Sequence, residues 1–221
     1  KMRIFNADGS EAEMCGNATR CVGKYVYDRG LTDKTQITLE TLAGIKILDL
    51  NVKDGEVQTV CVNMGSPELV PKNIPIDSNL DRFISEDVEV DGKVYKVTGV
   101  SMGNPHAVTF IDDTDSLEIE KIGPKFETHK LFPKKINTEF AQIVDRNTVK
   151  MRVWERGAGE TLACGTGACA TMVAANLNGL VDDEADLVLL GGTLHIKWDK
   201  NENKVYMTGP AKFVFDGTIT L

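Results

Sequence analysis

The chain has 221 residues, 42% hydrophobic and 26% charged, which is typical of a folded globular protein with one large domain or two modest ones. Its 25 lysine and arginine residues against 33 aspartate and glutamate residues give a net charge of −8, which argues against a nucleic-acid partner because phosphate recognition needs a basic surface. No apolar run approaches the roughly 20 residues that cross a bilayer, so we expect no membrane partner.

Short segments with alternating β-branched residues predict strands along most of the chain. In chain order these segments are 37–40, 45–52, 57–63, 88–90, 94–97, 107–111, 140–144, 149–154, 187–190, 194–198, 205–208, 213–215 and 218–221. Helices are predicted over 21–30 and 169–179, each closed by a glycine, and a third over 116–129, broken by Gly123-Pro124. The proline-rich stretch 65–75 is the candidate linker. Many short strands with few helices predict the α+β class.

Five cysteines are present: Cys15, Cys21, Cys61, Cys164 and Cys169. Their number is odd and none forms a C-x-x-C spacing, which is unfavourable for a disulfide framework, a zinc ribbon or a thioredoxin-type centre. With no secretory leader at the start, we predict a reducing, cytoplasmic location. We interpret Cys21 and Cys169 as core residues and Cys61 as a buried strand residue.

Two of the cysteines belong to an internal repeat. The segments EMCGNATRC at 13–21 and LACGTGAC at 162–169 share a Cys-Gly step, a small polar residue and a second cysteine. Each follows a loop rich in glycine and acidic residues, and each leads into a predicted helix. The repeat indicates two related halves. Far fewer residues precede Cys15 than precede Cys164 in its half, so we expect the first half to be truncated at its start.

A cysteine at a helix start can do acid–base chemistry. The unpaired N–H groups and the positive end of the helix dipole favour an anion there, either a thiolate or a substrate carboxylate. Two such helix starts on opposite sides of one carbon would let a thiolate remove a proton from one face while a thiol protonates the other. This chemistry inverts the carbon and needs no redox cofactor. A single Cys-Gly step is more often a packed small residue, but two matched copies favour the chemical interpretation.

Five segments together resemble the diaminopimelate epimerase family. They are FNADGSE at 5–11, CGN at 15–17, GNPH at 103–106, ERGAGET at 155–161 and CGTG at 164–167. The likeness extends over essentially the whole chain, including the closing segment from Gly209. The family's amino-terminal portion, with a Gly-Asn-Asp-Phe-type motif and a substrate-binding Gln, has no counterpart here, so those two contacts are not assigned.

The resemblance implies a cofactor-independent epimerase that interconverts LL- and meso-2,6-diaminopimelate, on the route to lysine and peptidoglycan precursors. It implies two pseudo-symmetric domains, each a β-barrel-like antiparallel sheet wrapped around a central helix. We expect residues 1–64 plus 210–221 to form one domain and 65–209 the other. The resemblance also implies a homodimer, with Phe215 at the dimer contact. Neither a cofactor nor a metal is expected.

The resemblance also assigns roles to individual residues. Cys15 and Cys164 match the catalytic acid and base, which exchange roles with the direction of turnover, and His106 and Glu155 match the pair that tunes their ionisation. The predicted substrate contacts are Asn6, Gly16, Asn17, Asn104, Asn137, Glu155, Arg156, Gly165 and Thr166. Arginine suits the distal end of the substrate because its planar fork grips a carboxylate with two hydrogen bonds.

Other interpretations remain open at this stage. Pro105-His106 could be a turn with a hydrogen-bonded imidazole, and Glu155 could be a structural partner of Arg152 or Arg156. Asn6 and Asn137 could be turn or cap residues. For the whole chain, the alternatives are a proline racemase-like enzyme, a non-catalytic amino acid-binding protein, and a thiol redox protein.

Overall fold

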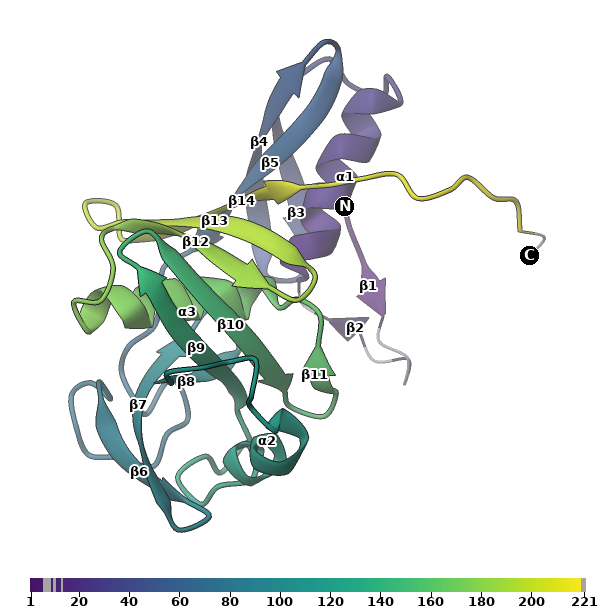
Figure 1. Ribbon diagram of the computed structural model, residues 1–221. Helices are drawn as coiled ribbons and strands as arrows, with labels where there is room; N and C mark the ends of the chain where they lie inside the picture. Colours follow the sequence, from purple (N-terminus) through teal and green to yellow (C-terminus); the bar gives the residue numbers. More distant parts are fainter. Residues whose placement is uncertain (6–8, 10, 13, 220–221) are drawn as a thin grey trace. The chain divides into compact units, whose positions relative to one another are not determined.

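The computed structural model describes residues 1–5, 9, 11–12 and 14–219, and the predicted substrate contact Asn6 lies outside this part of the chain. The chain divides into two compact units (Figure 1). Unit 1 comprises Lys1–Val62 and Thr208–Leu221, and unit 2 comprises Asn63–Met207. Each unit contains one of the two Cys-Gly repeats.

Unit 1 packs one helix on a small antiparallel sheet. Its elements are β1 (Ile4–Phe5), β2 (Glu11–Ala12), α1 (Gly16–Asp28), β3 (Gln36–Thr41), β4 (Gly44–Lys53) and β5 (Glu56–Gly65), of which unit 1 holds residues 56–62. Strands β3, β4 and β5 are neighbours in that order. A Cβ atom built on Gly23 of α1 would lie 3.0 Å from Leu50 and 3.1 Å from Leu48, two buried residues of β4. The small residue therefore lets the helix approach the sheet closely.

Unit 2 is a larger sheet with two helices. Its elements are β6 (Glu86–Val90), β7 (Lys93–Ser101), β8 (Pro105–Phe110), α2 (Ile119–Glu127), β9 (Asn137–Asp145), β10 (Thr148–Glu155), β11 (Gly159–Thr161), α3 (Gly165–Leu177), β12 (Glu184–Leu189), β13 (Gly192–Asp199) and β14 (Lys204–Pro210), the last of which ends in unit 1. The strand order is β14-β13-β12-β10-β9-β8-β7-β6, with β11 paired to β10. The β8–β9 and β10–β12 pairs are parallel.

Helix α3 is the centre of unit 2. It contacts β7, β8, β9, β12 and β13 (Figure 1). Its buried residues are Gly165, Gly167, Ala168, Cys169, Ala170, Thr171, Met172, Val173, Ala174 and Ala175. A helix that is apolar on all sides is a buried helix, and its small side chains let the strands come close. The sheet of unit 2 therefore wraps around α3, and the predicted α+β fold with a central helix is confirmed.

A second hydrophobic core of unit 2 lies between α2 and strands β6 to β10. It is rich in large side chains. The ring of Phe126 on α2 meets those of Tyr95 and Phe140 edge to face, with centroids 5.1 and 5.4 Å apart. Trp154, at the end of β10, belongs to the same cluster. This packing fixes the end of β10, from which Glu155 and Arg156 extend.

Several predicted elements differ from the structure. Helix α2 is continuous through Pro124, although a break was expected there. The strands predicted at 213–215 and 218–221 are absent from the described residues 211–219. Both repeat helices begin at the glycine that follows a cysteine, Gly16 and Gly165, which agrees with a helix start at each Cys-Gly step but is four or five residues before the predicted ranges 21–30 and 169–179. No helix in the described part of the chain is long and apolar enough to span a membrane.

Candidate functional site

Cys164 caps the start of α3. Its backbone is extended, with φ −120° and ψ 110°, and its Sγ atom accepts a hydrogen bond from the N–H of Gly167 at 3.4 Å. The hydroxyl of Thr166 lies 3.4 Å from the same sulfur. The cysteine is buried, with 6% of its surface exposed. Gly165 and Thr166, predicted to hold the reacting end of a substrate, thus form the first turn directly after the sulfur.

The electrostatics of Cys164 differ from the expectation for a helix start. Burial raises the pKa of its thiol well above the ordinary value, and the charges of Glu155 and Glu139 raise it further. The hydrogen bonds from Thr166 and Gly167 act in the opposite direction but are outweighed. For this cysteine the predicted tendency toward thiolate is therefore wrong, because desolvation and two carboxylates exceed the effect of the helix start.

His106 lies in strand β8 and is fully buried. Its Nδ1 atom lies 2.7 Å from Oε1 of Glu139, and its Nε2 atom lies 3.0 Å from Oδ1 of Asn104. The interpretation of Pro105-His106 as a simple turn is wrong, because both residues belong to a strand between β7 and β9. The imidazole thus joins a predicted substrate contact, Asn104, to a carboxylate that the sequence patterns did not single out.

Asn137 connects β8 to the segment that follows β10. Its Oδ1 atom accepts the N–H of Arg156 at 2.9 Å, and its Nδ2 atom donates to the carbonyl of Pro105 at 3.0 Å. The side chain is nearly fully buried. Asn137 therefore fixes the backbone position of Arg156, and its role as a direct substrate contact stays a prediction.

Arg156 and Glu155 extend from the end of β10. Arg156 is exposed, and its Nη1 atom donates to the carbonyl of Lys134 at 3.3 Å. Glu155 accepts the hydroxyl of Thr161 at 2.5 Å, and its charge acts on Cys164. The alternative pairing with Arg152 is not what the structure contains, because Arg152 forms a two-pronged pair with Glu160 at 2.6 and 3.0 Å.

Cys15 holds the corresponding position at the start of α1 in unit 1. Its backbone is extended, with φ −135° and ψ 115°, but its side chain makes no capping hydrogen bond. The next residues, Gly16 and Asn17, form the first turn, as predicted. The buried Arg20 donates to Oδ1 of Asn17 at 2.9 Å and to the carbonyl of Gly16 at 3.4 Å. A guanidinium therefore contacts the first turn in unit 1, whereas the cysteine at the corresponding turn in unit 2 is close to two carboxylates.

Two residues beside the cysteines were missed by sequence reasoning. Glu139 stands in a strand, where a glutamate usually faces solvent, so its pattern carried no signal. Arg20 lies one turn beyond the Gly16-Asn17 step of the repeat, and that spacing could have identified it. The expectation that Cys21 is a core residue is wrong, since Cys21 is exposed, whereas Cys169 is buried as predicted.

No set of three or more His, Cys, Asp or Glu side chains suited to a metal ion is present among the described residues. Phe215, the predicted dimer contact, lies in the irregular segment after β14 and is 84% exposed.

Solved structures with a similar fold place the chain in a structural class. A hydroxyproline epimerase from Agrobacterium vitis aligns with a TM-score of 0.65 at 15% identity, covering 94% of this chain and 66% of that one. A probable proline racemase from Agrobacterium radiobacter aligns with a TM-score of 0.67 at 14% identity, covering 97% and 71%. At these identities the likeness shows the fold alone, which this chain shares with those two proteins.

Sequence comparison is more specific. The family model for diaminopimelate epimerase matches residues 1–70 and 98–214. A diaminopimelate epimerase from Acetivibrio thermocellus is 62% identical over 221 residues, which cover all of this chain and 79% of that protein. One from Methanococcus maripaludis is 56% identical, with 100% and 80% covered. The chain belongs to the diaminopimelate epimerase family.

Proposed function

We propose that this chain interconverts LL- and meso-2,6-diaminopimelate, with Cys15 and Cys164 as the two acid–base groups. The observation that carries the proposal is the matched position of the two cysteines. Each is the residue before the first turn of a helix, each has an extended backbone, and each is followed by a glycine in that turn. The two units are, in this proposal, the pseudo-symmetric halves of the enzyme.

The proposed reaction moves one proton and leaves the oxidation state unchanged. One cysteine, as thiolate, takes the proton from the α-carbon, so that the C–H bond breaks and an S–H bond forms. The other cysteine, as thiol, gives its proton to the opposite face of the carbon and becomes the thiolate. Two-base inversion requires that both sulfurs reach one stereocentre. The enzyme then holds its thiol and thiolate in exchanged positions, ready for the reverse direction.

Binding at the reacting end depends on backbone donors. The backbone N–H groups of the first turns, at Gly16-Asn17 and at Gly165-Thr166, suit an α-carboxylate, and a carboxylate held there helps to stabilise the charge that develops when the proton leaves. Exposed Arg156 suits the carboxylate at the distal end, because a guanidinium has five N–H donors and the bond to the carbonyl of Lys134 involves only Nη1. A substrate with two amino acid ends fits this division of contacts.

The surroundings of Cys164 support one assignment of roles in the free enzyme. Since burial and the nearby carboxylates raise the pKa of this thiol, Cys164 carries its proton and is the acid for the first turnover. Cys15 is then the base.

The test is turnover of LL-diaminopimelate in deuterium oxide. We expect meso product and incorporation of solvent deuterium at the α-carbon, and added pyridoxal phosphate should have no effect. Cys15→Ser and Cys164→Ser should lower the rate by a factor of about 10² or more, since each removes one acid–base group. Cys21→Ser, an exposed cysteine on the same helix as Cys15, is the matched control and should keep the wild-type rate.

Two outcomes would contradict the proposal. The first is epimerisation without any solvent exchange, which proton transfer through thiols cannot explain. The second is racemisation of proline with no reaction on diaminopimelate, which would favour the proline racemase-like alternative.

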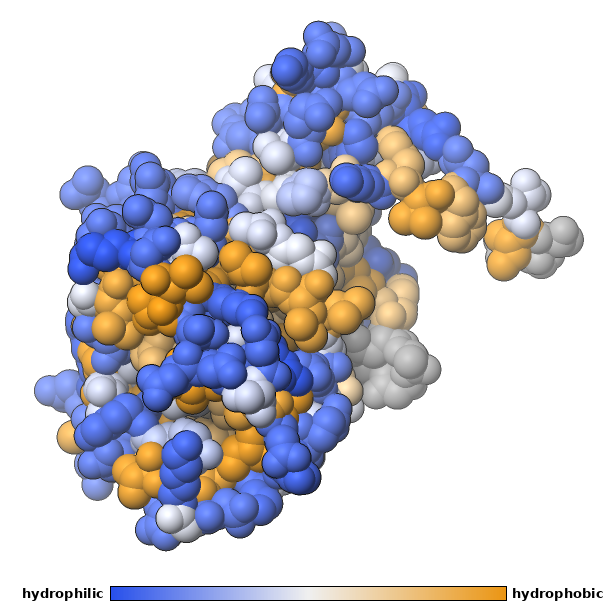
Figure 2. Space-filling view, in the orientation of Figure 1, coloured by the Kyte–Doolittle hydropathy of each residue, from blue (hydrophilic) through white to orange (hydrophobic). Residues whose placement is uncertain are grey.

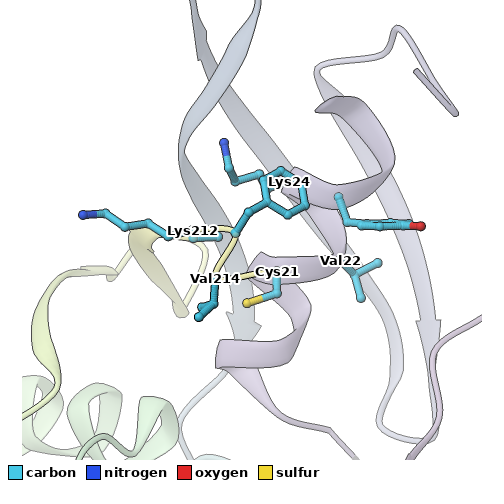
Figure 3. Close-up of a pocket in the computed structure, with 8 residues that line it drawn as sticks. Cys21, Val22, Lys24, Lys212 and Val214 are labelled. Carbon is cyan, nitrogen blue, oxygen red and sulfur yellow. The ribbon is translucent and has the colours of Figure 1, made fainter. Parts of the chain in front are cut away.

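We also propose that the chain forms a homodimer and works in the cytoplasm. The segment after β14 exposes apolar side chains, with Val214 90% and Phe215 84% exposed, and Figure 2 shows hydrophobic atoms along this tail. The tail begins against α1, where residues such as Cys21 and Val214 line a hollow of about 350 Å³ (Figure 3). In the part of the chain that the structure describes, none of the five cysteines forms a disulfide, as is usual in a reducing compartment.

Sedimentation of the Phe215→Ser variant tests the dimer. We expect a dimer for the wild-type chain and a monomer for this variant, because a polar side chain weakens an apolar contact. Leu190→Ser replaces an exposed apolar residue of unit 2 and is the matched control. A monomeric wild-type chain, or a variant that stays dimeric, would contradict this role of Phe215.

A further inference from the structure

Glu139 is a buried carboxylate that transfers no proton in the proposed reaction. It extends from β9, its side chain is fully buried, and its Oε1 atom lies 2.7 Å from Nδ1 of His106. Within the part of the chain that the structure describes, its other oxygen, Oε2, is buried without a hydrogen-bond partner. Burying a carboxylate with an unpaired oxygen is costly, so a chain that contains one needs a physical reason for it.

The same carboxylate lies against the first turn of α3. A Cβ atom built on Gly167 would come within 2.6 Å of Glu139 Oε1 and 3.3 Å of Cys164 Sγ. The N–H of Gly167 also donates to that sulfur at 3.4 Å. Glu139 and Cys164 therefore approach the same small patch of backbone, and a glycine leaves room for both.

His106 holds the carboxylate at this place. Its other ring nitrogen, Nε2, faces Oδ1 of Asn104 at 3.0 Å, so both partners of the ring are oxygen atoms. The imidazole and the carboxylate thus form a buried pair, with Nδ1 of His106 beside Oε1 of Glu139. The carboxylate is the member of the pair that lies against α3, while the far side of the imidazole is directed to Asn104.

Four titratable side chains interact at this place: His106, Glu139 and Glu155 from three strands, and Cys164 at the start of α3. His106 from β8 and Glu155 from β10 act on Glu139, and Glu155 and Glu139 act on Cys164. Burial raises the pKa of Glu139, and His106 opposes that effect. Close to Cys164, a negative charge makes a second negative charge on sulfur unfavourable.

We propose that Glu139, held by His106 against the first turn of α3, is a positioning residue that keeps Cys164 in its thiol form in the free enzyme. This inference rests on the proposed function, in which Cys164 must hold a proton before it can protonate the substrate. It also explains the glycine at 167, because any side chain there would push the carboxylate away from the sulfur.

The test is the pH dependence of Cys164 alkylation by iodoacetamide, followed by mass spectrometry of the peptide that contains it. The midpoint of the profile reports ionisation of the sulfur, and the limiting rate at high pH reports its accessibility. In Glu139→Gln we expect the midpoint to fall by about one pH unit, a tenfold gain in thiolate below the midpoint. Asp145→Asn removes an exposed carboxylate from the same strand and should leave the midpoint unchanged.

Gly167→Ala provides a second variant that keeps the glutamate. Alanine favours a helix, so α3 should form, while the new Cβ displaces the carboxylate from its place beside the sulfur. We expect the midpoint to fall in this variant as well. An unchanged midpoint in the folded variants, or a rise in Glu139→Gln, overturns the proposal.

The alkylation profile does not depend on turnover, so the two proposals can fail separately. If the wild-type chain epimerises diaminopimelate but the Cys164 midpoint is the same in Glu139→Gln, only the proposed role of Glu139 is contradicted. If the midpoint shifts as expected but the chain does not epimerise diaminopimelate, the proposed function is contradicted and the effect of Glu139 on the sulfur is established.

Discussion

The indole Nε1 of Trp154 donates a hydrogen bond to Oε2 of Glu127 at 2.8 Å, and both side chains are buried. Through its other oxygen, Glu127 accepts the N–H of Gly157 at 3.2 Å and pairs with Lys135 at 2.9 Å. The carboxylate of Glu127 on α2 thus binds the residue before Glu155 and the residue after Arg156. The end of α2 is therefore part of the support of the candidate site, although it carries no predicted site residue.

Removing this carboxylate should weaken both stability and substrate binding. We expect Glu127→Ala to lower the free energy of unfolding by about 2–3 kcal/mol, because the buried indole N–H loses its acceptor. We also expect KM for diaminopimelate to rise more than kcat falls, since Arg156 loses its fixed position. Urea unfolding and steady-state kinetics measure the two effects.

The control for this variant is Glu118→Ala, which removes an exposed glutamate from the other end of α2. It should change neither quantity measurably. A loss of stability without any change in KM would show that Glu127 supports the core but not the site.

Gly123 should be intolerant of substitution although it lies inside a helix. A Cβ atom built there would come within 2.3 Å of Cδ2 of Trp154. Gly123→Ala gains helix propensity of about 1 kcal/mol, but displacing a packed indole costs about 1–3 kcal/mol or more, so we expect a lower melting temperature. In Gly23→Ala of α1 the nearest atoms belong to leucine side chains at 3.0 Å and beyond, and the loss should be smaller. Equal melting temperatures for the two variants would contradict this reading of the packing.

The same glycine shows where prediction from sequence ends. Gly123-Pro124 indicates a break by local propensity, yet α2 continues because its buried residues Ile119 and Phe126 pack into the core. Tertiary packing outweighs the local preference. In the tail, β-branched residues predict strands, but a strand also needs a neighbour to share its hydrogen bonds, and within 211–219 no such ladder forms.

In the candidate site, too, some features can be predicted from sequence and others cannot. The Cys-Gly steps predict the two helix starts because capping is local chemistry that depends on a few adjacent residues. Glu139 could not be found from sequence, because its importance comes from pairing with His106 across two parallel strands that are far apart in the chain. The orientation of Asn137 toward the backbone of Arg156 likewise depends on tertiary structure.

In unit 1, the free energy of unfolding should depend on pH through Asp28. Lys24 donates to the carbonyl of Val57 at 2.8 Å, Asp28 accepts the N–H of Val57 at 2.9 Å, and the two side chains pair at 2.6 Å. Burial by itself raises the pKa of Asp28, but the hydrogen bonds from Lys24 and Val57, with the charge of Lys24, bring it below the ordinary value.

The sign of the effect follows from this lowered pKa. The unfolded chain binds a proton more readily than the folded chain, so the stabilisation is complete above the unfolded pKa of about 3.9 and is lost as pH falls through the folded value. We expect Asp28→Asn to lose about 1–3 kcal/mol at pH 7 in urea unfolding, with the difference from wild type shrinking below about pH 4. Asp33→Asn, an exposed control in the following loop, should show no difference. A deficit for Asp28→Asn that is the same at every pH would exclude the ionised carboxylate as its cause.

Arg156 should discriminate between a long, two-ended substrate and a short one. Its guanidinium is exposed and its backbone is fixed by Asn137, so it can present a rigid fork to a carboxylate. We expect Arg156→Lys to raise KM for diaminopimelate about tenfold or more while kcat changes less, because a lysine offers a point charge where two parallel hydrogen bonds are needed. Arg146→Lys, an exposed arginine paired with Asp182, is the matched control and should keep the wild-type KM. If Arg156→Lys instead lowers kcat at unchanged KM, the residue acts on the transition state, and the assignment of Arg156 to the distal end of the substrate is wrong.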